Sequence, residues 1–547
     1  MKHLIFSFLF FLIFIGICNS QQYLGYSNIK IHPSVVTQTE PVICISPLNP
    51  QILFVSAVTV NAPFRSEGVY FSTNGGTTWF GNDTCTGQSV ANHGGSPGIA
   101  MDNNGTFLIT HVGISFPGVF SHYSTNFGAS WSNAYTLFST LTDDKGTTTA
   151  DYIPSSPYYG RIYNARAVLS GSYPVYFSYS TNGGLNWISA FAVNNPPPQR
   201  CSGGFIKTGK DGKIYLTWAG VAATTPYTEN FVGFAMSTNG GDNWSVNQNV
   251  YSVNGINGTF PSKNGIKVNG LPHLAVDKTN GPRSGWIYIV TTEKNLAPAG
   301  SDPDIILHYS SNNGTSWSPG IRVNQDALNN GKIQYFPAID VDSTGAVNIL
   351  FYDDRNTASD SAEIILARSQ NGGSTWREYV ISNHRFQPKP IYGASGGYQG
   401  DHIALQASGN KLYALWMDDY PSSGLYQVWI APIDISTIAV RNISTEVPTS
   451  FKLFQNYPNP FNPITKIKFS IPNPTVIARS GATWQSQGVS LKVFDILGKE
   501  VAVLVNETLQ PGTYETTFDG SNLPSGIYFY QLRSGNYIDT KKLVLLK

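Results

Sequence analysis

Charge is scarce in this sequence. Charged residues make up 12% of its 547 residues, and the 34 basic residues are almost balanced by 33 acidic ones. An average globular protein carries about twice that share. A chain with so little charge of either sign has no overall field that would attract nucleic acid or an acidic membrane surface. We therefore expect no nucleic-acid partner, and any ligand must be recognised at a local site.

Cysteine is also rare. Beyond the N-terminal apolar segment only Cys44, Cys85 and Cys201 remain. Three cysteines permit at most one disulfide in an oxidising compartment, and they leave one thiol over. Their spacing does not resemble that of a zinc site, so the sequence predicts structural cysteines, buried or paired. No metal site and no cofactor are expected.

Long apolar runs are missing except at the N-terminus. Lys2 and His3 precede an apolar run from Leu4 to about Cys18, and small residues lead to Ser20. This pattern is typical of a secretory signal peptide, and we expect it to span residues 1–20. No later stretch approaches the roughly 18 apolar residues that a membrane helix needs. We therefore expect no transmembrane segment in the mature chain.

Aromatic residues, glycine and proline are abundant instead. Aromatic residues reach 13%, and the chain has 53 glycines and 33 prolines, a composition typical of turn-rich all-β proteins. One pattern, S-x-N-x-G-x-x-W, recurs at intervals of roughly 50 to 75 residues, which is a strong repeat signal. Its six copies begin at Ser72, Ser124, Ser180, Ser237, Ser310 and Ser369.

Each copy is the turn before the fourth strand in a longer unit of four short strands. The clearest unit runs from Phe336 past Trp376, with a glycine turn at Gly345 and alternating apolar residues on both sides. Four antiparallel strands in each repeat predict one blade of a β-propeller, which we place at residues 21–433. Seven blades are favoured and six are possible. The last unit lacks a fourth strand, and we expect the strand at Asn28–Pro33 to complete it and remove an open edge.

The repeated turns have a structural explanation. Serine and asparagine side chains bond to nearby backbone groups, glycine supplies positive φ, and tryptophan packs between blades. In an antiparallel meander these turns share one face, whereas the longer and more varied connections share the other face. Binding residues concentrate in such loops, so we expect the site on the face opposite the six turns.

The repeated motif resembles the Asp-box, or BNR repeat, of sialidases and related secreted proteins with β-propellers. The resemblance covers about residues 28 to 433, with asparagine in place of the usual aspartate. A sialidase would need three arginines to clamp a substrate carboxylate, a tyrosine with a glutamate partner, and an acidic aspartate. The F/Y-R-I-P signature is absent, with Phe64-Arg65-Ser66 the nearest string. The substrate-binding candidates on the long-loop face are Arg65, Arg200, Arg355, Tyr398 and His402.

Two functions follow from this resemblance. A binding propeller would recognise a glycan or a surface protein through the long loops. A glycoside hydrolase would need two suitably spaced carboxylates on the same face. The catalytic candidates are Asp353, Asp354, Asp401 and Asp418. Because the signature is absent and the arginine clamp is incomplete, binding is favoured and enzymatic activity is left open.

The C-terminal part has a different composition. Residues 434–450 read as a polar linker, and short strands broken by proline and glycine follow over 451–547, which predicts a small β-sandwich. The segments NYPNPFNP, DILGKEV, LPSGIYFY and KKLVLLK resemble a type A C-terminal sorting domain of the type IX secretion system. The resemblance implies that this machinery is a partner and that the protein is secreted or held on the outer cell surface. Residues 477–488 read as an insertion in the first hairpin.

Overall fold

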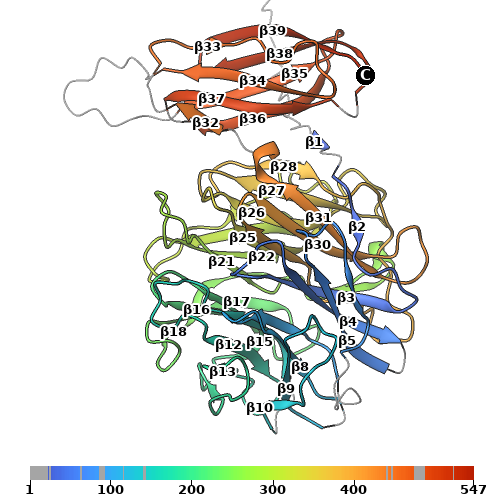
Figure 1. Cartoon of the computed structure of the whole chain (residues 1–547), viewed down its shortest axis with the longest axis vertical. Helices are drawn as coiled ribbons and strands as arrows, with labels where there is room; N and C mark the ends of the chain where they lie inside the picture. Colours follow the sequence, from blue (N-terminus) through green and yellow to red (C-terminus); the bar gives the residue numbers. More distant parts are fainter. Residues whose placement is uncertain are drawn as a thin grey trace, which may run out of the picture.

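The computed structural model describes residues 22–23, 26–61, 64–85, 93–114, 116–139, 143–438, 441–444, 448–472, 487–509, 511–520 and 523–547. The predicted signal peptide and residues 477–486 of the predicted insertion lie outside the described residues. Figure 1 shows two β-rich bodies, a large one built from the first four fifths of the chain and a small one built from the C-terminal part.

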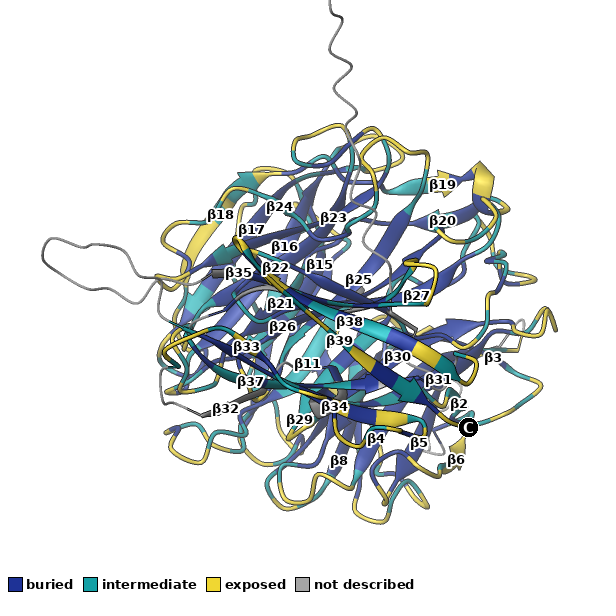
Figure 2. Ribbon diagram, turned by 90° about the horizontal axis from the view of Figure 1, so that it is seen from above, coloured by how far each residue is buried: buried dark blue, intermediate teal, exposed yellow. Residues whose placement is uncertain are grey.

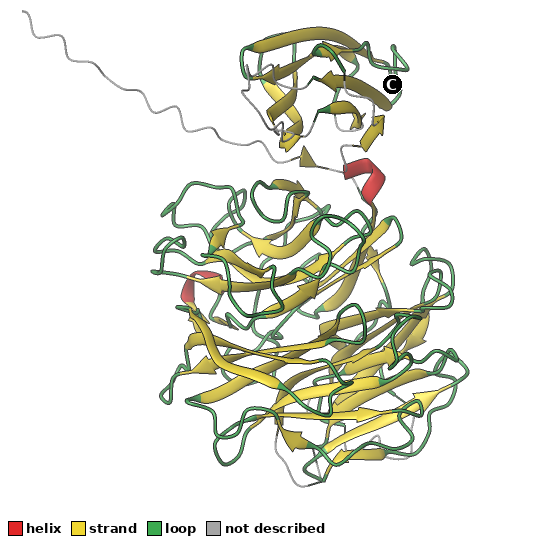
Figure 3. Cartoon of the chain, turned by 90° about the vertical axis from the view of Figure 1, so that its left-hand side faces the viewer, coloured by secondary structure: helices red, strands yellow, loops and turns green. Residues whose placement is uncertain are grey.

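The protein is almost entirely β, as the composition predicted. Among the described residues the helices are one short 3-10 helix, η2 (Pro261–Lys263), and one α-helical turn, α1 (Ile435–Ile438). Figure 3 shows strands throughout both bodies, with loops joining them. No helix in the described part of the chain has the length and apolarity that a membrane crossing requires.

Among the described residues the large body contains seven sheets with four antiparallel strands each, and in the sixth of them a short fifth strand, β1 (Gln22–Tyr23), is added in parallel beside the last strand. In chain order they are β3 to β6 (Thr37–Ile45, Leu53–Asn61, Phe64–Ser72, Phe80–Asn82), β7 to β10 (Gly98–Met101, Phe107–Val112, Val119–Ser124, Tyr135–Phe138), β11 to β14 (Asp143–Ala150, Ile162–Val168, Val175–Ser180, Phe191–Ala192), β15 to β18 (Arg200–Thr208, Ile214–Val221, Glu229–Ser237, Ser245–Ser252), β21 to β24 (His273–Val276, Ile287–Glu293, Asp304–Ser310, Ile321–Arg322), β25 to β28 (Gln334–Val341, Val347–Asp353, Glu363–Ser369, Arg377–Val380), and β29 to β31 (Ala404–Ser408, Lys411–Asp418, Gln427–Asp434) with β2 (Ile29–Lys30).

The sheets close into a ring. The first strand of each sheet contacts the first strand of the next, from β3 through β7, β11, β15, β21, β25 and β29 back to β3. The N-terminal strand β2 pairs antiparallel with β31, with Ile29 opposite Ile430 and Lys30 opposite Trp429. The prediction that this segment completes the last sheet is therefore confirmed. The large body is a β-propeller, and Figure 2 shows its buried strands surrounded by exposed loops.

Apolar side chains fill the space between neighbouring sheets. In one such cluster Tyr288 and Leu307 of one sheet pack against Val347 and Ile349 of the next, with Trp376 of the sixth motif copy beside them. Strand β26 is buried along its whole length because both of its faces meet other sheets. Burial on both faces explains why its sequence is almost continuously apolar instead of alternating.

The six repeated turns all join the third and fourth strands of a sheet and form what we call the turn face. In each copy the serine Oγ accepts a hydrogen bond from the backbone N–H of the residue four positions later, at 2.8 to 2.9 Å. In each copy the asparagine Oδ1 accepts one from the backbone N–H four residues after it, at 2.9 to 3.0 Å. These side chains stabilise their own turns.

The opposite face, which we call the long-loop face, carries the connections between sheets and between second and third strands. Two of its connections hold each other. The first, residues 253–272, contains a small hairpin of β19 (Gly258–Phe260) and β20 (Ile266–Val268). The Lys267 N–H donates to the Gly397 carbonyl of the second connection, residues 381–403, at 2.7 Å. Asn264 Nδ2 donates to the Pro388 carbonyl at 2.9 Å.

The small body is a sandwich of two four-stranded sheets. One contains β32 (Arg441–Ser444), β37 (Gly512–Asp519), β34 (Ile464–Ile471) and β33 (Lys452–Leu453), and the other contains β36 (Glu500–Leu509), β35 (Gln487–Phe494), β38 (Gly526–Ser534) and β39 (Tyr537–Leu545). A core that includes Phe469, Leu491 and Tyr530 joins the two sheets.

The segment predicted as a linker is more structured than its polar composition suggested. Strand β31 ends at Asp434, α1 follows at once, and β32 pairs with β37 of the sandwich. Backbone pairing to β37 gives this polar stretch its order, and composition alone does not reveal such pairing. The cysteines Cys44, Cys85 and Cys201 are all buried and unpaired, which agrees with a structural role without a disulfide.

Candidate functional site at the mouth of the central channel

A narrow cavity, which we call the channel, lies at the centre of the propeller. It has a volume of about 120 Å³ and is lined by the first strands of all seven sheets. Glu40, His273 and His402 are among the lining residues; His273 begins β21, His402 lies just before β29, and Glu40 lies near the start of β3. The long-loop end of the channel is therefore where polar side chains meet a concave surface, as ligand sites generally require.

Three side chains from distant parts of the chain meet at this end. The Tyr398 hydroxyl donates a hydrogen bond to Glu40 Oε1 at 2.9 Å. The guanidinium carbon of Arg65 lies 5.7 Å from the centre of the Tyr398 ring. Glu40 is 4% exposed, whereas Arg65 is exposed and Tyr398 is half-buried. We use the name channel-mouth site for Glu40, Arg65, His273, Tyr398, Asp401 and His402.

The local backbone explains how Glu40 reaches this position. Glu40 has a φ of +53°, in the left-handed region that non-glycine residues seldom occupy. It lies at an irregularity in the pairing of β3 with β4, between Thr39 and Val42. Bulges and unfavourable backbone angles of this kind recur at functional sites because they redirect a side chain.

The connection that carries Tyr398 is pressed against the same strand. Thr39 Oγ1 donates to the Gln399 carbonyl at 2.6 Å. A Cβ atom on Gly400, which has a φ of +118°, would lie 2.1 Å from that same Oγ1. Only glycine allows this approach, so the contact between β3 and residues 399–400 fixes Tyr398 beside Glu40.

The protonation states follow from burial and nearby charge. Burial, with the Glu40 and Asp401 charges, raises the pKa of Tyr398 well above its usual value of 10, so the phenol keeps its proton. Burial lowers the pKa of His273 well below 6.5, and His402 and Lys207 act in the same direction. The site therefore combines a phenol donor and a neutral imidazole with carboxylates and one exposed guanidinium.

Three of the four predicted catalytic carboxylates lie elsewhere and are buried. Asp353 is completely buried, and it accepts bonds from the Arg355 side-chain Nε and backbone N–H, both at 2.7 Å. Arg355 Nη2 also donates to Glu378 Oε1 at 2.9 Å. The opposite charge of Arg355 is thus used within the protein, and this pair supports the loop after β26.

Asp354 and Asp418 are equally enclosed. Asp354 accepts bonds from the buried Lys263 ammonium at 2.5 Å and from the Ile333 N–H at 2.7 Å. Asp418 Oδ2 accepts from Trp416 Nε1 at 2.7 Å and lies 2.9 Å from His384 Nε2. These contacts use the carboxylate oxygens to hold the connections of the long-loop face in place.

Asp401 differs from the other three aspartates. It is half-buried, belongs to the channel-mouth site, and accepts a bond from Asn269 Nδ2 at 3.2 Å. His402 follows it and lines the channel, with its ring centre 6.4 Å from that of His273. Of the predicted catalytic residues, Asp401 alone is placed beside the predicted binding residues Arg65, Tyr398 and His402.

The three arginines considered for a carboxylate clamp have separate partners. Arg65 stands over Tyr398, and Arg355 is held by Asp353 and Glu378. The Arg200 guanidinium is stacked between the rings of Tyr173 and Tyr227, 4.0 and 4.5 Å from their centres. The structure thus gives only Arg65 to the channel-mouth site.

The C-terminal part matches a known family. Residues 455–546 match the family described as secretion system C-terminal sorting domain. The tail is a type IX sorting domain. It indicates export by the type IX secretion system to the cell surface or the medium. Among curated proteins no match is found.

Several solved structures resemble this chain at low identity. An ulvan lyase described as a new family of polysaccharide lyase is 12% identical, covers 76% of this chain and 94% of its own, and has a TM-score of 0.46. A protein of unknown function from Dyadobacter fermentans is 12% identical, with coverages of 78% and 95% and a TM-score of 0.32. An α-L-arabinofuranosidase of Fusarium graminearum is 13% identical, with coverages of 62% and 93% and a TM-score of 0.37.

Proposed function

We propose that this exported protein binds a glycan at the channel-mouth site. The observation that carries the proposal is the junction of Tyr398, Glu40 and Arg65 at the mouth of the channel. It brings an aromatic ring, a buried carboxylate and an exposed guanidinium to one concave surface. Sugars offer hydroxyl groups and apolar ring faces, which such a combination can bond and cover. A protein ligand on the same face is the competing outcome.

The charges at the site favour an acidic sugar. Arg65 is exposed, and its guanidinium presents the planar set of donors that suits a carboxylate or sulfate group. Glu40 accepts a bond from Tyr398, and Asp401 accepts one from Asn269. Arg65 therefore supplies the charged group of the site that faces solvent.

Glycan binding can be measured on an array followed by calorimetry with the best ligand. We expect Arg65→Ala to weaken binding at least about tenfold, the loss of one charge-assisted contact, and Tyr398→Phe to weaken it less. Arg385→Ala is the matched control, because Arg385 is an exposed arginine on the same face, in residues 381–403. Binding that survives Arg65→Ala, or capture of a protein partner with no glycan bound, would reject the proposal.

A glycoside hydrolase is the second candidate, and one observation favours it. Tyr398 and Glu40 form a phenol–carboxylate pair, in which the carboxylate can take the phenol proton as the oxygen attacks. Asp401 is the half-buried acid beside them. A tyrosine with a glutamate partner is what the sialidase resemblance of the repeats implies.

Turnover assays separate this candidate from binding alone. The purified protein would be incubated with sialylated and neutral polysaccharides and the released sugars quantified. If the pair is catalytic, Glu40→Gln and Tyr398→Phe should each abolish release, while Arg385→Ala retains it. Failure of the wild-type protein to release any sugar rejects the hydrolase and leaves the binding proposal to its own test.

A further inference from the structure

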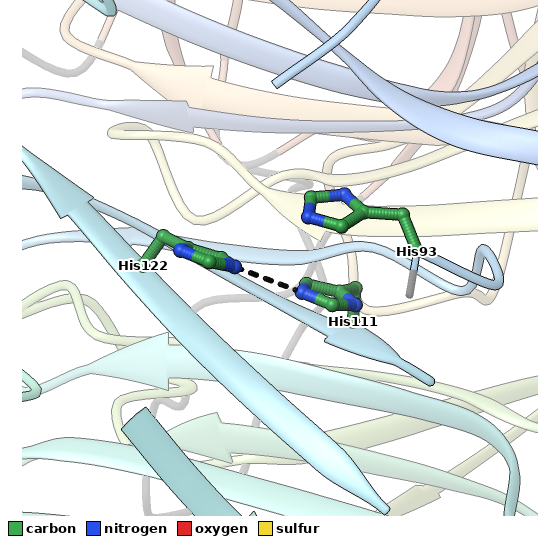
Figure 4. Close-up of side chains that lie close together, drawn as sticks. All are labelled: His93, His111 and His122. Atoms are coloured by element: carbon green, nitrogen blue, oxygen red, sulfur yellow. Dashed lines mark hydrogen bonds between the residues drawn. The ribbon is translucent and has the colours of Figure 1, made fainter. Parts of the chain in front are cut away.

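Three buried histidines lie close together, two in the second sheet and one in the segment that leads into it. His93 precedes β7, His111 is the last residue but one of β8, and His122 lies in β9. Their exposures are 1%, 0% and 0%, and one ring nitrogen from each lies within 4.8 Å of the others. Figure 4 shows the three rings together, with a dashed line between the facing nitrogens of His111 and His122. They are outside the channel lining and play no part in the proposed binding site.

The backbone partners of two rings fix where their protons are. His111 Nδ1 lies 2.9 Å from the Val112 carbonyl oxygen, and His122 Nδ1 lies 2.9 Å from the Ser132 carbonyl oxygen. A carbonyl oxygen can only accept, so each Nδ1 carries the hydrogen. Each neutral ring then presents a lone pair on Nε2, and the two Nε2 atoms are 3.1 Å apart.

Two facing lone pairs repel each other, and a metal ion bound to both nitrogens would remove that repulsion. A metal ion suits the distance. Zinc–nitrogen bonds of about 2.0 to 2.1 Å at a tetrahedral angle separate two ligand nitrogens by roughly 3.3 Å.

The third ring has the partner that a metal-binding histidine usually has. His93 Nδ1 contacts the carboxylate oxygen Oε2 of Glu67, which is also buried. His93 Nε2 has no hydrogen-bond partner among the described residues. The ring stacks on His111, with centres 3.9 Å apart. A carboxylate behind one nitrogen and a free lone pair on the other is the arrangement that orients imidazole toward zinc.

We propose that His93, His111 and His122 bind a divalent transition metal, with zinc the preferred ion, and that Glu67 orients His93. Imidazole nitrogen suits zinc, copper and nickel better than calcium or magnesium. Because the site is buried, the metal has a structural role. It ties the connection from the first sheet, at His93, to strands β8 and β9 of the second sheet.

The first test measures metal content in the full-length protein, purified without a histidine tag. We expect about one zinc ion per chain by mass spectrometry, retained on dialysis, and a lower Tm after removal by chelator. The variants His111→Asn and His122→Asn keep a donor near the position of Nδ1 and remove the Nε2 ligand. They should lose the metal, and chelator should no longer change their Tm.

His308→Asn is the matched control. His308 occupies the position in β23 that His122 occupies in β9, two residues before the motif serine, and its Nδ1 lies 2.9 Å from the Ser318 carbonyl. It stacks on Tyr251 and is not part of the histidine cluster. This variant should retain the metal and the response to chelator.

Cobalt substitution keeps the proposal testable if the variants do not fold. Cobalt added to the metal-free wild-type protein should give the strong visible absorption of a four-coordinate site, and zinc should displace it. Folded wild-type protein that binds neither ion overturns the proposal. Metal that stays bound in folded His111→Asn or His122→Asn overturns it as well.

Discussion

The two faces of the propeller are built from different kinds of interaction. On the turn face, six copies of one motif bond to their own backbone, and each needs only eight consecutive residues. On the long-loop face, buried charges join connections that lie far apart in the chain, such as Lys263 with Asp354. The turns of the turn face can recur because all their contacts lie within one short segment. The connections of the long-loop face can differ from one another because each is held by its own partners.

This contrast predicts different sensitivities to mutation. Removing one member of a buried ion pair leaves the other charge unpaired in the interior, which costs more than losing a single neutral hydrogen bond. Single substitutions on the long-loop face should therefore span a wider range of effects than those in the turns.

The largest effect is expected for Lys263→Met. Lys263 is fully buried, and its ammonium donates to Asp354 and to the carbonyls of Ser359 and Ser361. We expect a loss of about 3 to 5 kcal/mol in the free energy of unfolding, measured with denaturant. Lys213→Met is the control, because Lys213 is near the turn face and makes one long contact to Asn313. Equal effects of the two changes would contradict the comparison.

A pair of glycines tests packing on the two faces. Gly314 belongs to a repeated turn with a φ of +81°, and an added Cβ would lie 2.1 Å from the buried Phe234 ring. Gly331 belongs to a long connection with a φ of +76°, and nothing lies near its added Cβ. We expect Gly314→Ala to cost about 3 kcal/mol, from strain and overpacking, and Gly331→Ala about 1 kcal/mol. If Gly331→Ala lowered the free energy of unfolding more than Gly314→Ala, the repeated turns would be shown to tolerate an added side-chain atom.

Glu293, at the long-loop end of β22, should make stability depend on pH. Burial raises its pKa to about 7, above the unfolded value of about 4.3. The folded state binds the Glu293 proton more tightly than the unfolded state does, and this adds to the free energy of unfolding. The added stability is complete below the unfolded pKa and is lost as pH rises to about 7. Glu293→Gln should therefore gain about 2 to 3 kcal/mol relative to wild type between pH 5 and pH 8. If the free energy of unfolding changed with pH in the same way in the variant and the wild type, this effect would be excluded. Asp242→Asn, on a repeated turn, is the control.

The smallest effect is expected within one repeated turn. Ser237 Oγ accepts the Gly241 N–H at 2.9 Å, and Ser237→Ala leaves that buried donor without its partner. We expect a loss of about 1 kcal/mol, seen as a small decrease in Tm. Asn239→Asp should be nearly neutral, since a carboxylate oxygen can still accept the Asn243 N–H. A loss as large as that of Lys263→Met would mean that the turns are not self-contained.

The sequence predicts the fold well because the repeated unit is local. Alternating apolar strands, the glycine of each turn and the tryptophan after it lie within one short segment, and the structure keeps them together. The closing strand was also predictable, because Asn28–Pro33 resembles the fourth strands of other units and the last unit lacks one. The β32 strand could not be predicted, since its order depends on pairing with β37.

The residues of the proposed site follow from the sequence only in part. The sequence predicts Arg65, Tyr398, Asp401 and His402 as candidates from their position after or before inner strands, yet nothing in it marks Glu40, whose partner Tyr398 is 358 residues away. Asp353 was indistinguishable from an exposed loop aspartate, although Arg355 two residues later encloses it. The histidine cluster draws on three separate segments, so no spacing motif reveals it.

The pairing of β2 with β31 also sets an order of events in time. Residue 29 leaves the ribosome early, but its partner, residue 430, is made about 400 residues later. The ring cannot be completed before then, and such distant contacts form slowly. In the sorting tail the most distant pairing of two strands, that of β32 with β37, joins residues 441 and 515, which is a much shorter separation. The sorting tail, which serves as the export signal, can therefore fold quickly. The propeller ring closes separately, once β31 is available to pair with β2.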